Sequence, residues 1–135
     1  MAAIHAEIAR DNDCLRRRFL ATFTTFTATE VAEPAGPQAI GMRELDRWRA
    51  EGLVFAISAN GEDRYPAFQF ANGRPRPVVA QVLATLPPGL TPWQVAFWFV
   101  SSNSWLGGAA PVSIVDTDPE SVVCAAERER DEVAG

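Results

Sequence analysis

The feature that most constrains the fold is a change of hydrophobic period in the middle of the chain. Two short runs, residues 53–58 and 64–70, have the apolar and aromatic composition of β-strands. Between them lie Asn60 and Gly61, a pair that tolerates the positive φ angles of a tight hairpin turn. Pro66 cannot donate a ladder hydrogen bond, so the second strand is expected to be an edge strand at that point. Because helical spacing flanks the hairpin on both sides, the sequence predicts a mainly α fold with one β-hairpin.

The segment before the hairpin is expected to form three helices. Apolar residues recur at helical spacing over residues 3–23. Residues 27–30, Thr-Ala-Thr-Glu, fit a capping box that starts a short helix at 28–33. A third helix is expected over 37–51, and Gly52 suits the left-handed position that follows a helix.

The segment after the hairpin returns to helical spacing. A helix is expected over residues 77–86, and a second, almost entirely apolar one is expected to follow Thr91, which can cap it. A short helix is predicted at 111–115, and Asp118 is expected to cap a final helix. We therefore divide the chain into residues 1–76 and residues 77–135.

The ionisable residues argue against an enzyme. All twelve basic residues are arginine, and the lack of lysine excludes a P-loop lysine, a Schiff-base lysine and a serine–lysine dyad. His5 is the one histidine, which gives no support to a catalytic triad or a His-rich metal site. Cys14 and Cys124 make no metal pattern and are expected to be free thiols. Residues 116–120 supply too few ligands for a metal, so we expect no catalytic residue, metal or cofactor.

Charge is distributed unevenly along the chain. Residues 1–76 hold ten arginines and ten acidic residues, including three consecutive arginines at 16–18, whereas residues 77–135 hold two arginines and seven acidic residues and account for the formal net charge of −5. An arginine-rich front half and an acidic back half indicate two different partners. The alternative is a solvated surface whose charge has no functional meaning.

No segment is apolar enough to cross a membrane. The longest apolar run, residues 95–100, is far shorter than the roughly 20 residues that a bilayer requires. The first fourteen residues carry charges where a secretory signal needs an apolar stretch. We therefore expect a cytoplasmic protein that does not contact a membrane.

The order of elements in the front half, helix, short turn, helix, hairpin, is that of a winged helix-turn-helix. In such a fold the second helix of the motif enters the major groove of DNA and the hairpin lies along the backbone. The acidic residues of the same helix oppose phosphates, so a purely structural lobe is the alternative interpretation. The candidate DNA-binding residues are Arg43, Arg47, Arg49, Arg64, Arg74 and Arg76.

Aromatic residues crowd the back half, at 93, 97, 98, 99 and 105. Most are expected to fill a core, but aromatic residues that a small unit cannot bury mark interfaces with other proteins. Trp105, which lies in a predicted loop, is the best candidate for an exposed contact.

The back half also resembles a known family. Trp98 and Phe99, then Asn-Ser-Trp-Leu-Gly-Gly at 103–108, then Pro-Val-Ser-Ile-Val at 111–115 are similar to the Xre/MbcA/ParS-type toxin-binding domain of bacterial antitoxins. The resemblance covers about residues 77–126. It implies a helical domain that binds a partner toxin, and the residues it points to are Trp98, Asn103, Trp105, Leu106, Gly107 and Gly108.

The resemblance implies a type II antitoxin. Such proteins neutralise a cognate toxin, often of the NAD-consuming RES type, and many regulate their own operon through an N-terminal DNA-binding domain. The partners expected are therefore a protein toxin, a second copy of the chain in a homodimer, and operator DNA. The alternative is a stand-alone winged-helix transcriptional regulator that uses its back half for dimerisation.

Overall fold

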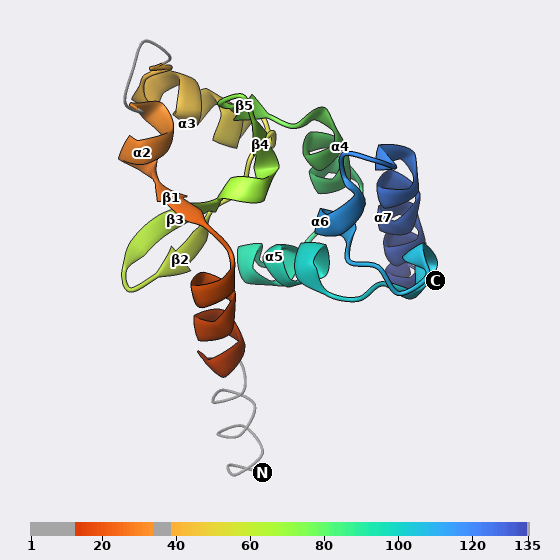
Figure 1. Cartoon of the computed structure of the whole chain (residues 1–135). Coiled ribbons are helices and arrows are strands. Elements are labelled where there is room, and N and C mark those ends of the chain that lie inside the picture. The colour runs from red at the N-terminus through yellow and green to blue at the C-terminus, as the bar shows by residue number, and fades with distance from the viewer. Residues whose placement is uncertain (1–12, 34–38, 135) are drawn as a thin grey trace.

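The computed structural model describes residues 13–33 and 39–134. These residues are mostly helical, with one three-stranded and one two-stranded antiparallel sheet (Figure 1). The predicted mainly α class is therefore confirmed. No helix within this part of the chain is both long and apolar enough to cross a membrane.

The predicted hairpin forms two strands of the three-stranded sheet, with β3 at its centre. β2 (Ile57–Ala59) and β3 (Glu62–Pro66) pair antiparallel, and β1 (Thr25–Thr27) pairs with the other side of β3. Asn60 and Gly61 connect β2 to β3 with φ angles of 54° and 76°, as the turn chemistry predicts. β1 was not predicted from the sequence.

Both hairpin strands are shorter than the sequence predicts. Residues 54–56 are buried but belong to no strand, and β3 ends at Pro66, followed by a 3₁₀ turn, η1 (Ala67–Gln69). The chain then forms a second small hairpin from β4 (Phe70–Ala71) and β5 (Arg74–Pro75). β3 is the central strand of the sheet. At Pro66, however, it pairs with β1 alone, because β2 pairs no further than Arg64, so the expectation of an edge at that point is confirmed.

In the front half, the predicted capping box is present, but the helices differ in length from those predicted. Residues 13–22 are helical, and the rest of the helix predicted at 3–23 lies outside the described residues. The capping box is confirmed, because Thr27 accepts from the N–H of Glu30 and Glu30 accepts from the N–H of Thr27 at the start of α2 (Ala28–Ala32). The helix start predicted at 37 lies outside the described residues, and residues 39–41, predicted to be helical, are not. α3 spans Met42–Ala50, since Gly41, with φ 84° and ψ 158°, is not helical.

The back helices match the sequence analysis. α4 (Pro77–Thr85) and α5 (Pro92–Val100) both begin with proline, and Thr91 caps α5. A 3₁₀ turn, η2 (Ser104–Leu106), leads to α6 (Pro111–Ile114), and α7 (Pro119–Ala134) closes the fold against α4. Figure 1 shows α4, α6 and α7 grouped on one side of the molecule and α2 and α3 on the other.

Two apolar cores hold the molecule together. The smaller lies among α2, α3 and the sheet and includes Leu45, Trp48 and Tyr65. The larger packs Phe19 and Phe55 of the front half against the helices of the back half. Its buried members are Phe19, Phe55, Ile57, Val78, Val79, Val82, Leu86, Trp93, Val95, Ala96, Phe99, Val115, Val122 and Ala126.

Candidate partner-binding surface

The Trp105 loop, residues 101–110, joins α5 to α6 and is organised by one buried polar residue. The side-chain oxygen of Asn103 accepts from the N–H of Trp105 at 2.9 Å. Its carbonyl oxygen accepts from the N–H of Leu106 at 3.0 Å and of Gly108 at 2.9 Å, and its own N–H donates to Ala109 at 3.1 Å. Only 9% of Asn103 is exposed. Asn103 therefore shapes the loop from inside and is itself hidden from a partner.

The two glycines of the loop are required by the backbone. Gly107 ends η2 in the left-handed region with φ 66°, and Gly108 has φ 93°. A Cβ at Gly108 would come no closer than 3.8 Å to the hydroxyl of Ser102, so the constraint is the positive φ and not the space. Ser102 also donates to the carbonyl of Gly108 at 2.7 Å, which ties the two ends of the turn together.

Trp105 is the prominent side chain of this loop. Its side chain is 46% exposed, whereas Leu106 beside it is half-buried. The guanidinium of Arg128, from α7, lies 5.5 Å from the centre of the indole ring. Such a cation–π contact favours one orientation of the indole. The loop thus presents a large apolar side chain on an ordered backbone, which is the arrangement of an interface contact.

Trp98 lies apart from the exposed face of the loop. It is half-buried on α5, packs against the larger core, and meets the ring of Phe99 edge-on at 5.2 Å. Its indole N–H is buried and has no hydrogen-bond partner among the described residues. Of the six predicted toxin-binding residues, the structure brings five together in the loop and places Trp98 at the edge of the core.

The arginines predicted to bind DNA are mostly engaged with carboxylates of the same chain. On α3, Arg47 pairs with Glu44 one turn earlier. Arg49 reaches across to the hairpin, where its guanidinium lies 2.8 Å from the carboxylate of Asp63. This hydrogen bond raises the pKa of Arg49 above its ordinary value. Both pairs reduce the positive charge that α3 offers to phosphates.

The remaining candidates lie on β3, α3, β5 and the residue before α4. Arg64 of β3 lies 2.9 Å from a carboxylate oxygen of Glu62. Arg76, just before α4, pairs with Asp116 of the back half and donates to the carbonyl of Phe68 at 2.9 Å. Arg43 and Arg74 are exposed and make no ion pair within the described residues. Four of the six arginines are therefore paired with a carboxylate of the same chain.

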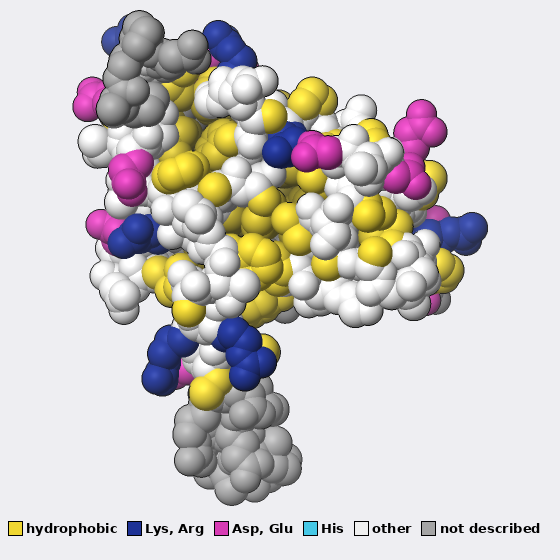
Figure 2. Space-filling view, viewed as in Figure 1, with side chains coloured by type: hydrophobic (Ala, Val, Ile, Leu, Met, Phe, Trp, Pro, Cys, Tyr) yellow, Lys and Arg dark blue, Asp and Glu magenta, His cyan; other side chains and the backbone are white. Residues whose placement is uncertain are grey.

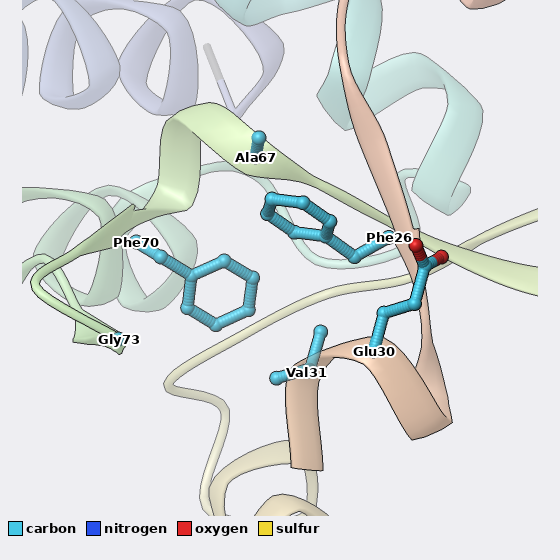
Figure 3. A pocket seen from close by; sticks show the side chains of 6 residues that line it. All are labelled: Phe26, Glu30, Val31, Ala67, Phe70 and Gly73. Carbon is cyan, nitrogen blue, oxygen red and sulfur yellow. The ribbon is translucent and has the colours of Figure 1, made fainter. Parts of the chain in front are cut away.

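Two pockets were not foreseen from the sequence. The first is an apolar hollow of about 350 Å³ where β1, α2 and β4 meet. Figure 3 shows two phenyl rings facing each other across it, with a carboxylate at its rim; its lining is Phe26, Glu30, Val31, Ala67, Phe70 and Gly73. The second, of about 310 Å³, is lined by Arg16, Arg17, Asn60 and Trp93. The run of arginines at 16–18 was visible in the sequence, but its nearness to the hairpin turn was not.

Other chemistry is sparse in the described ranges. No three His, Cys, Asp or Glu side chains there are close enough to hold a metal ion. Cys14 and Cys124 are free and exposed. The chain matches no family model, no curated protein and no solved structure.

Proposed function

We propose that this protein is the antitoxin of a type II toxin–antitoxin system and that the Trp105 loop contacts the partner toxin. The observation that carries the proposal is the 46% exposed indole of Trp105 on a loop braced by the buried Asn103. A large apolar side chain so exposed in an ordered loop leaves apolar area for a second protein to cover. The family resemblance of residues 77–126 supports the same assignment.

The loop has the composition of an interaction hot spot. Tryptophan and arginine dominate such sites because each buries much area while fixing few rotatable bonds. The guanidinium of Arg128 lies beside the Trp105 ring, so the loop brings together the two residue types that dominate such sites. Because backbone hydrogen bonds already hold the loop in one conformation, little conformational entropy is lost when a partner binds it.

The proposed mechanism is steric and stoichiometric. The antitoxin covers a functional surface of its toxin, and no covalent bond is made or broken. By the resemblance, the toxins that such antitoxins block are often of the RES type, which consumes NAD. The proposal places the complex in the cytoplasm and makes the antitoxin a homodimer.

We further infer that the front half is a winged helix-turn-helix that binds operator DNA. The succession of α2, α3 and the β2–β3 hairpin supports this assignment, and β1 closes the hairpin into a sheet beside the helix pair. The ion pairs of Arg47, Arg49 and Arg64 weigh against strong phosphate contact by α3. If the protein instead acts as a stand-alone regulator, it will bind DNA with steep salt dependence and without a toxin partner.

Co-expression with the product of the neighbouring gene tests the main proposal. We expect a stoichiometric complex, and Trp105→Ala should weaken it by about 2 kcal/mol or roughly 30-fold, as for a central interface tryptophan. Met42→Ala is the matched control, because Met42 is 44% exposed but lies on α3, in the front half. No complex with the wild-type chain, or equal losses in both variants, would overturn the proposal.

A further inference from the structure

A second pocket, the arginine pocket, lies where the N-terminal helix, the hairpin and α5 meet. The arginine pocket, of about 310 Å³, takes Arg16 and Arg17 from the helix at 13–22, Asn60 from the hairpin turn and Trp93 from α5. Three elements distant in sequence thus bring two guanidinium groups and an amide to one hollow. Figure 2 shows dark-blue arginine side chains gathered on this described part of the N-terminal helix.

The guanidinium of Arg16 packs against the indole ring of Trp93. It lies 5.2 Å from the centre of that ring. Trp93 is itself fixed, since only 6% of it is exposed and its indole N–H donates to the carbonyl of Ser58 at 2.9 Å. A guanidinium placed over an aromatic ring still offers N–H donors around its own edge. Arg16 is therefore preorganised to donate to an oxyanion.

The arginines at 16–18 form no ion pair within the described residues. This contrasts with Arg47, Arg49, Arg64 and Arg76, each of which has an acidic partner. Asp13 also lines the pocket, one helical turn before Arg16 and Arg17, and subtracts part of the positive charge.

We propose that the arginine pocket binds a phosphate group. Two guanidiniums and an amide around one hollow match the several oxygens of a phosphate, and arginine recognises phosphate through paired N–H donors. The phosphate can belong to a nucleic-acid backbone or to a free phosphate ester. This site lies on elements separate from the Trp105 loop, so the inference does not rest on the proposed toxin binding.

Two probes distinguish the sources, both applied to the full chain. Inorganic phosphate is titrated while the indole Nε1–H signal of Trp93 is followed by NMR. A 20-base-pair duplex of arbitrary sequence is titrated by fluorescence anisotropy at several salt concentrations. Saturation by phosphate with no binding of the duplex identifies a free phosphate ester. Binding of the duplex that phosphate inhibits identifies a nucleic-acid backbone.

Four variants distinguish the effect of the arginine donor geometry on phosphate binding from the effect of net positive charge. Arg17→Gln should weaken phosphate binding about tenfold and lower the salt slope of duplex binding by about one. Arg16→Lys keeps the charge but loses the planar donor set, so it should also weaken phosphate binding about tenfold. Asp13→Asn should strengthen binding, because it removes the opposing carboxylate. Arg130→Gln is the charge-matched control on α7 and should change neither titration.

The proposal is overturned if neither probe binds saturably, or if Arg130→Gln weakens binding as much as Arg17→Gln. It is also overturned if Arg16→Lys binds as well as the wild type, because general charge attraction would then suffice. The toxin complex provides an independent readout. Arg17→Gln should leave it intact, so failure of the pocket and failure of the Trp105 surface are distinguishable.

Discussion

At the scale of single residues, the buried side chain of Gln69 makes the two backbone hydrogen bonds that a neighbouring β-strand would otherwise make with Phe55. Its side-chain nitrogen donates to the carbonyl of Phe55 at 2.8 Å, and its side-chain oxygen accepts from the N–H of Phe55 at 2.8 Å. Phe55 lies in the buried segment 54–56, which pairs with no strand. Gln69 therefore satisfies backbone groups that would otherwise be stranded in the core. A lone glutamine in an aromatic run gives no sequence signal of this role.

We predict that Gln69→Leu destabilises the protein by about 1–3 kcal/mol, because both backbone groups of Phe55 lose their partner. The free energy of unfolding in urea measures the effect. Gln81→Leu, on the exposed face of α4, is the matched control and should change stability by less than about 0.5 kcal/mol. Equal stability of the two variants would show that the pair of bonds to Phe55 contributes nothing.

At the scale of elements, short sequence motifs correctly predicted the helix caps and tight turns. They did not predict the strands whose formation depends on pairing with a strand distant in sequence. The Thr27 box, the Asn60 turn and the proline starts of α4 and α5 all depend on a few adjacent residues. β1 is three residues long and has no period of its own; it is a strand because β3 lies beside it. Short pairings of this kind are decided by partners distant in sequence.

The Thr27 box also predicts a pH dependence. The backbone N–H of Thr27 lowers the pKa of Glu30 below its usual value. A carboxyl whose pKa is lowered on folding stabilises the protein above its unfolded pKa, about 4.3, and the contribution is lost as the pH falls through the folded pKa. We predict that wild type exceeds Glu30→Gln in stability at pH 6 and that the difference vanishes at strongly acidic pH.

Urea unfolding at the two pH values measures this difference. The second capping box is the control, because Thr91 pairs with the uncharged Gln94. Thr91→Ala should cost about 1 kcal/mol at both pH values. A wild-type advantage over Glu30→Gln that is unchanged in acid would contradict the account.

At the scale of the whole molecule, the larger core joins the two halves that the sequence separates at residue 76. Phe19 meets Trp93 edge-on at 5.6 Å and Phe97 at 6.3 Å, and Phe55 stacks on Phe99 at 6.1 Å. The aromatic content of each half was visible in the sequence, but these contacts join residues more than forty positions apart. The arginine pocket escaped prediction for the same reason, since its parts meet only after the halves pack.

We predict that a fragment of residues 77–135 does not unfold cooperatively by itself. Without Phe19, Phe55 and Ile57, the apolar face of α5 is left exposed, and each lost aromatic contact costs several kcal/mol. Near-ultraviolet circular dichroism during urea unfolding compares the fragment with the full chain. A cooperative transition in the fragment would mean that the back half is an independent domain, as the division at 76 predicts.

The most direct test of the central claim, that Trp105 contacts a partner toxin, is an NMR measurement on the four tryptophan indoles. The Nε1–H signals are compared between the free protein and its complex with the neighbouring gene product. The account predicts that the Trp105 signal shifts and exchanges more slowly with water, while that of Trp48, buried in the smaller core, stays where it was. A complex in which Trp105 keeps its free position and exchange rate would contradict the account.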